Sequence, residues 1–250
     1  MGSRIRQPPP HQPQPPPAVA DRDDRSPFPI VGIGASAGGL EALEGFLTNV
    51  PAHSGMAFVV VQHLDPTRKD LLAELLQRCT AMPVAQIEDR MAVAPDHVYI
   101  IPPGRDLSIL NGVLHLMDPA APSGLRLPID LFLRALADDR REHSIGVILS
   151  GMGSDGTLGL RAIRERAGAV FVQDPATAKF DSMPRSAIDA GLADIVAPVA
   201  ELPARILAYL SHAPRRSASD GKLTSSDQSS LEKVMILLRT HTGHDFSMYK

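Results

Sequence analysis

Cysteine is almost absent from this sequence. Its single cysteine, Cys79, excludes an internal disulfide, and the surrounding LLQRCT favours a small apolar residue on a helix over a nucleophile. No apolar run reaches the roughly 20 residues that a membrane-spanning helix needs, and the first thirty residues contain no apolar core of a signal peptide. We therefore expect a soluble, cytoplasmic protein in a reducing compartment.

An excess of charge of one sign is also missing. The chain carries 25 basic and 28 acidic side chains, with a net charge of −3. A surface that binds nucleic acid is strongly basic, so we expect no nucleic-acid partner. At 250 residues, with 44% hydrophobic composition, the chain is long enough for one substantial domain with short appendages.

Proline, in contrast, is concentrated at the N-terminus, where residues 1–29 hold nine of the 23 prolines. We expect residues 1–27 to be a disordered leader, with a ligand for a proline-binding module as the alternative. Residues 28–210 should form the domain. Residues 211–230, rich in Ser, Asp, Lys and Arg, are typical of a linker, and residues 231–250 begin with an amphipathic helix too short to form a domain.

Apolar runs alternate with helical patterns through the expected domain. Helix-period leucines and other apolar residues follow Gly39, Pro66 and Pro128. Four runs resemble strands buried on both faces, FPIVGI, AFVVVQ, VYII and SIGVILS, and AVFVQ is a further expected strand. This alternation predicts an α/β fold with a doubly wound, mostly parallel sheet and helices on both faces. Asn111-Gly112, between alternating apolar residues, predicts a two-residue hairpin and therefore an antiparallel excursion of the sheet.

A serine motif follows the first expected strand. Residues 34–38, GASAG, match G-x-S-x-G in its strand-turn-helix context. Small neighbours allow a sharp turn that presents the Ser36 hydroxyl above the sheet edge. The amides at the start of the following helix, including that of Ala37, would then face an oxyanion.

The same residues support a second interpretation. Gly32-x-Gly34-x-x-Ala37 fits the G-x-G-x-x-G/A fingerprint of dinucleotide binding, which predicts a nucleotide-binding module. That fingerprint requires an acidic residue about 20 positions further on, closing the second strand. Here the second strand ends in Gln62-His63, with the nearest acid, Asp65, beyond it. The residues around Ser36 alone leave both interpretations open.

Two further residues favour nucleophilic catalysis. His63 ends the second strand on the edge where Ser36 ends the first, and adjacent strands lie about 5 Å apart, so the imidazole is within reach of the serine. Asp155 follows SIGVILS in a glycine-rich loop, where the Met152 amide is a second oxyanion donor. The alternative for Asp155 is an N-cap of the helix near Thr157. Histidines without comparable placement are interpreted as structural: His53, His97, His115 and His143.

Four segments together resemble the catalytic domain of the chemotaxis methylesterases (CheB): GASAGG, VVVQHL, LSGMGSDGT and DSMPRSAI. The resemblance covers Phe28 to Leu210. It implies Ser36 as nucleophile, His63 as base, Asp155 as the orienting carboxylate and the Met152 amide as an oxyanion donor. It also implies hydrolysis of glutamate γ-methyl esters on a membrane-bound chemoreceptor, with release of methanol and with no metal or organic cofactor, and deamidation of receptor glutamines in related enzymes.

Departures from the family pattern qualify this expectation. Ala37 stands where family members commonly have threonine, and a proline-rich leader stands where they carry a phospho-receiver domain, so control by aspartyl phosphorylation is unsupported. The last residues, LLRTHTGHDFSMYK, resemble the opening of a CheR methyltransferase but stop before a cofactor site, so we expect no methyltransferase activity. Their histidine pair, His241 and His244, lacks further metal ligands. A catalytically silent interaction domain is the third interpretation, and the sequence leaves the oligomeric state open.

Overall fold

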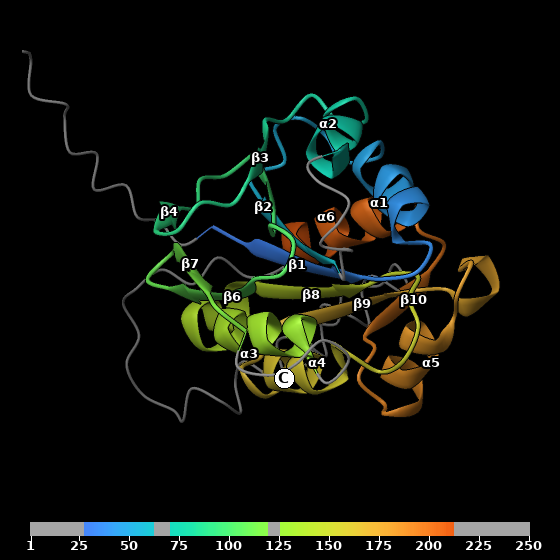
Figure 1. Cartoon of the computed structure of the whole chain (residues 1–250). Helices are drawn as coiled ribbons and strands as arrows, with labels where there is room; N and C mark the ends of the chain where they lie inside the picture. Colours follow the sequence, from blue (N-terminus) through green and yellow to red (C-terminus); the bar gives the residue numbers. More distant parts are fainter. Residues whose placement is uncertain (1–27, 63–70, 120–125, 213–250) are drawn as a thin grey trace, which may run out of the picture.

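A parallel sheet of seven strands forms the centre of the computed structural model, which describes residues 28–62, 71–119 and 126–212 (Figure 1). The leader and the C-terminal stub expected from the sequence lie outside the described residues, as does nearly all of the expected linker. The strand order is β10-β9-β8-β1-β2-β5-β3. The strands are β1 (Ile30–Ala35), β2 (Ala57–Gln62), β3 (Val84–Gln86), β5 (Val98–Ile100), β8 (Ser144–Ile148), β9 (Ala169–Gln173) and β10 (Ile195–Ala197).

Helices cover both faces of this sheet, which confirms the doubly wound architecture (Figure 1). On one face lie α1 (Gly39–Leu47), α2 (Leu71–Gln77) and α6 (Leu202–His212), and on the other lie α3 (Pro128–Arg140), α4 (Thr157–Glu165) and α5 (Ser182–Asp189). Cys79, which we expected on a helix, lies in a turn just beyond the end of α2. None of the helices in the described part of the chain is long and apolar enough to span a bilayer.

The two faces of β1 differ in the size of their side chains. Val31 and Ile33 pack into the core beneath α1 and α6, whereas Gly32 and Gly34 face α3. A Cβ at Gly32 would lie 2.7 Å from a Leu133 methyl carbon, and one at Gly34 would lie 2.5 Å from Ile129 Cγ2. Helix α3 therefore packs directly on the β1 backbone, and this close approach requires glycine at both positions.

The expected hairpin is present, with Asn111 and Gly112 at φ 51° and 73° between β6 (Asp106–Leu110) and β7 (Val113–Met117). It is not an excursion of the main sheet. It pairs instead with β4 (Met91–Ala92) in a separate three-stranded antiparallel sheet, and all pairings described in the main sheet are parallel. The Asp139 carboxylate of α3 accepts the amides of Asn111 and Gly112, so the turn is held to the helix beneath the sheet rather than to a strand.

Candidate active site

Strand β1 lies at the point where the strand order reverses. From β1 the chain crosses to β2 on one side, while β8 lies on the other and leads on to β9. In doubly wound sheets, ligands bind at such switch points, in the crevice at the carboxyl ends of the strands. Ser36 directly follows β1, and the loop that begins at Leu149 follows β8. The topology therefore places the candidate nucleophile where this fold forms its sites.

Ser36 occupies the expected turn between a strand and a helix. Its amide donates to the Ser150 carbonyl at 3.0 Å, and its carbonyl accepts the Gly39 amide at 2.9 Å. Gly38, at the N-cap of α1, has a left-handed backbone with φ 69°. A residue with a side chain is strained in that conformation, so the glycine allows the sharp turn. Ser36 itself is partly exposed, as a nucleophile must be.

Ser150 connects the serine turn to the neighbouring loops, a role that the sequence analysis missed. It is only 1% exposed. Its hydroxyl donates to the Ala37 carbonyl at 2.9 Å and accepts the Phe180 amide at 3.0 Å, while its own amide donates to Gln173 Oε1 at 2.9 Å. The available signal was the position of a small polar residue at the end of the apolar run SIGVILS.

Asp155 is buried behind the site and 4% exposed. Its carboxylate accepts the amides of Ile129, at 3.1 Å, and Asp130, at 2.9 Å, which are the second and third residues of α3. The alternative interpretation of Asp155 as the N-cap of its own helix is therefore wrong, because Asp155 caps α3, and the N-cap of α4 is Gly156. Each carboxylate oxygen has a second lone pair, so Asp155 is still able to accept an imidazole N–H.

The expected base, His63, lies outside the described residues. The parallel register pairs Ala35 with Gln62, and Ser36 and His63 are the next residues of their segments in the sequence. In the described part of the chain, no hydrogen-bond acceptor is found for the amides of Ala37 and Met152. The role of these two amides as oxyanion donors stays a prediction.

The serine turn and the loop after β8 are in direct contact. A Cβ added at Gly151 would lie 3.1 Å from Ser36 Cβ, so the residue before Met152 packs directly on Ser36. Beside the turn, a surface cavity of about 470 Å³ is lined in part by Gly38, Ser150 and Lys179. Within the described residues, no cluster of three or more His, Cys, Asp or Glu side chains is arranged to hold a metal ion.

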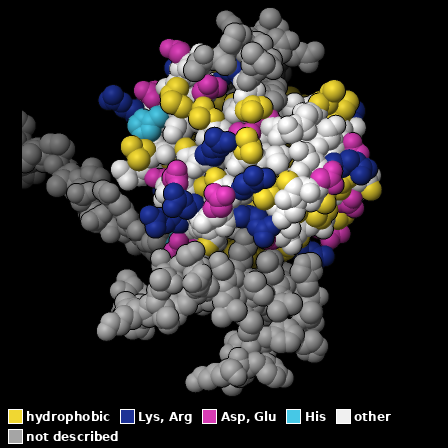
Figure 2. All heavy atoms as spheres, turned by 90° about the horizontal axis from the view of Figure 1, so that it is seen from below, with side chains coloured by type: hydrophobic (Ala, Val, Ile, Leu, Met, Phe, Trp, Pro, Cys, Tyr) yellow, Lys and Arg dark blue, Asp and Glu magenta, His cyan; other side chains and the backbone are white. Residues whose placement is uncertain are grey.

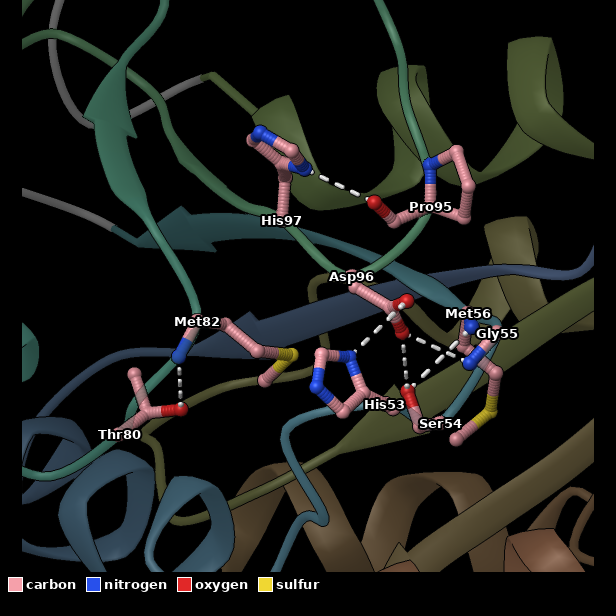
Figure 3. Close-up of polar contacts among 9 residues, drawn as sticks. All are labelled: His53, Ser54, Gly55, Met56, Thr80, Met82, Pro95, Asp96 and His97. Carbon is pink, nitrogen blue, oxygen red and sulfur yellow. Dashed lines mark hydrogen bonds and ion pairs between the residues drawn. The ribbon is translucent and has the colours of Figure 1, made fainter.

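A second grouping of serine, histidine and aspartate lies at the opposite, amino edge of the sheet (Figure 3). The Asp96 carboxylate accepts the Gly55 amide at 2.7 Å and the Ser54 hydroxyl at 3.5 Å, and it lies 4.0 Å from Nδ1 of His53. This is not the order of a triad, because the aspartate rather than the histidine contacts the serine. With the His53 side chain 94% exposed, the group holds two loops together.

These features define an α/β protein with a serine-bearing turn at the switch point of a doubly wound sheet, an arrangement that suits nucleophilic catalysis. Gly32 and Gly34 are explained by the packing of α3, and Gln62 rather than an acid closes β2, so the nucleotide-binding interpretation is not favoured. Residues 31–206 match the family model described as CheB methylesterase. The chain belongs to the CheB methylesterase family.

Similar proteins support this assignment. The chain is 34% identical over 195 residues to a protein-glutamate methylesterase/protein-glutamine glutaminase of Pseudomonas aeruginosa, covering 76% of this chain and 55% of the relative. It is 35% identical over 197 residues to the protein-glutamate methylesterase FrzG of Myxococcus xanthus, covering 78% and 59%. The crystal structure of the Thermotoga maritima CheB methylesterase catalytic domain superposes with a TM-score of 0.67 at 33% identity, covering 72% of this chain and 97% of that domain. The chain thus spans about half the length of these curated relatives.

Proposed function

We propose that this chain is a protein-glutamate methylesterase that hydrolyses glutamate γ-methyl esters on a chemoreceptor or a similar signalling protein. The observation that carries the proposal is the position of Ser36 on a glycine-bounded turn at the switch point, in a chain of this family. We also propose a protein-glutamine glutaminase activity at the same site, since such an activity is named for the relative from Pseudomonas aeruginosa. The proposed location is the cytoplasm, with the substrate in a membrane.

In the acylation step, the Ser36 hydroxyl attacks the ester carbonyl carbon and His63 takes its proton. Asp155 holds the imidazole in the productive tautomer and stabilises its positive charge. The amides of Met152 and Ala37 donate hydrogen bonds to the oxyanion of the tetrahedral intermediate. The intermediate collapses as the C–O bond to the methoxy group breaks, and methanol leaves with the proton that His63 returns.

In the second step, His63 takes a proton from water, which attacks the acyl-enzyme. The bond to Ser36 Oγ breaks, the serine regains its proton, and a free glutamate carboxylate remains on the receptor. With a glutamine substrate the leaving group is ammonia, and the second step is unchanged. In both steps His63 takes and returns the proton. The buried carboxylate of Asp155 is needed in this mechanism because it stabilises the positively charged imidazole.

The test compares methanol release from methylated receptor membranes by the wild type, Ser36→Ala and the matched control Ser54→Ala. We expect the wild type and the control to release methanol, because Ser54 lies at the opposite edge of the sheet. Ser36→Ala should lose most of the rate enhancement and retain only what binding and oxyanion donors supply. Release of methanol by Ser36→Ala at the wild-type rate would disprove the assignment of Ser36 as the nucleophile. No release by the wild type would favour a silent interaction domain.

A further inference from the structure

The starts of α3 and α4 are capped by each other rather than by their own N-cap residues. The N-cap of α3 is Leu127 and that of α4 is Gly156, and neither makes a side-chain cap hydrogen bond. Asp155, just before α4, accepts two amides of the first turn of α3. In return, Asp130 of α3 accepts the Gly159 amide of the first turn of α4 at 2.7 Å.

We propose that Asp130 is a positioning residue of the active site, which fixes the direction of the Asp155 carboxylate by joining the starts of α3 and α4. The inference rests on the proposed function, because it assumes that Asp155 orients the catalytic base. Asp130 acts through two groups. Its amide is a direct donor to Asp155 Oδ1, and its carboxylate holds the α4 turn that immediately follows Asp155.

Packing around this pair leaves little freedom. Both aspartates are 4% exposed. A Cβ at Gly159 would lie 2.5 Å from Leu133 Cβ and 3.1 Å from the Asp130 backbone, so the two helices are in contact at this turn. If the Gly159 amide lost its acceptor, the start of α4 would lose its only described side-chain cap, and the loop that carries Asp155 would shift with it.

The pKa of the buried Asp130 carboxyl depends on a few neighbouring groups. Burial raises the pKa of Asp130, and the negative charge of Asp155 raises it further, while the amides of Gly159 and Gly156 and the positive charge of Arg134 act in the opposite direction. Substitution of Asp130 by alanine would therefore leave the amides of Gly159 and Gly156 without this acceptor. A conservative amide should keep most of the geometry.

The first variants to compare are Asp130→Ala and Asp130→Asn, because asparagine retains an oxygen that accepts the Gly159 amide. A matched control is Asp138→Ala, which removes another carboxylate of α3, one that pairs with Arg166 just beyond α4 at 2.8 Å but is 68% exposed. The surface of α3 and α4 that carries such arginine and acidic side chains is shown in Figure 2. The control removes the ion pair between α3 and the residue that follows α4, and it leaves the contacts of Asp155 unchanged.

Two measurements separate positioning from general stability, each normalised to the folded fraction. The first is the rate at which a fluorophosphonate labels Ser36, a reaction that forms a bond from Oγ to phosphorus and expels fluoride while the serine proton passes to the base. The second is the pair kcat and KM for methanol release. We expect Asp130→Ala to lower the labelling rate and kcat by about tenfold or more with KM unchanged, since a misplacement near 1 Å costs up to about a hundredfold.

Rescue by the conservative variant completes the test. Asp130→Asn should stay within about threefold of the wild type, and Asp138→Ala should match it. Wild-type labelling and kcat in Asp130→Ala, or an equal loss in Asp138→Ala, would overturn the inference and leave the proposed function intact. A wild type that neither reacts with the fluorophosphonate nor releases methanol would overturn the proposed function and this inference with it.

Discussion

Substitution of Ser150 by alanine tests how the serine turn is held. The change removes the hydroxyl that donates to the Ala37 carbonyl and accepts the Phe180 amide. Each lost hydrogen bond costs about 1 kcal/mol, and the two part-buried main-chain groups left without this partner add roughly 1 kcal/mol more. We therefore expect the free energy of unfolding to fall by about 2–3 kcal/mol.

Activity should fall as well, because Ser150 Oγ holds the peptide that follows Ser36, the proposed nucleophile. Free movement of the Ala37 peptide would displace both Ser36 and the Ala37 amide, and we expect a loss of methanol release of about tenfold or more. Stability is measured by urea denaturation of the full chain, and activity is measured at a temperature where the variant is folded.

Ser144→Ala is the matched control, since Ser144 is also buried and begins the same strand that Ser150 follows. Its hydroxyl donates to the Arg141 carbonyl at the opposite edge of the sheet. The control should lose stability but keep its activity once folded. The reasoning is refuted if Ser150→Ala keeps full activity, or if its unfolding free energy changes by less than about 0.5 kcal/mol.

Two more predictions concern a close contact and a buried phenol. Gly151→Ala places a methyl group against Met183 Sδ and 3.1 Å from Ser36 Cβ, so it should reduce methanol release at least tenfold. The control Gly45→Ala, within α1, should keep its activity, and equal activities of the two variants would contradict the packing argument. Burial, followed by the nearby charge of Asp194, raises the pKa of Tyr209, so the phenol ionises first in the unfolded state and the free energy of unfolding should fall as the pH rises above about 10. In urea titrations at pH 8 and 11, the free energy of unfolding should fall less for Tyr209→Phe than for the wild type. An equal fall in both proteins would contradict the raised pKa of Tyr209.

The long and strongly patterned elements were predictable from the sequence. AFVVVQ and AVFVQ coincide with β2 and β9, and the Asn111-Gly112 turn joins the expected pair of strands. Three short strands, β3, β4 and β10, were missed, because two or three residues are too few to show a periodicity. Strand β5 is equally short and was predicted only as part of the longer apolar run VYII. The second sheet was missed for a related reason, since the partner of the hairpin is the two-residue strand β4.

The turn at the candidate site was predictable, because it depends on local sequence. The Ser36 motif specifies a turn between neighbouring elements, and the structure contains that turn. The partners of Asp155 were not predictable, because α3 begins far before it in the sequence and only the fold brings the two together. For the same reason, the alternative interpretation of Asp155 considered only the helix that follows it in the chain and not α3, which it caps.

The face of β1 that packs on α3 makes the site sensitive to substitutions at residues that would not touch a substrate. Neither Gly32 nor Gly34 carries any chemistry, yet a larger residue at Gly34 would push Ile129, whose amide holds Asp155. The geometry of the candidate site therefore depends partly on the absence of side chains at these two positions. Substitutions along this strand should therefore disturb the candidate site, although neither glycine would touch a substrate.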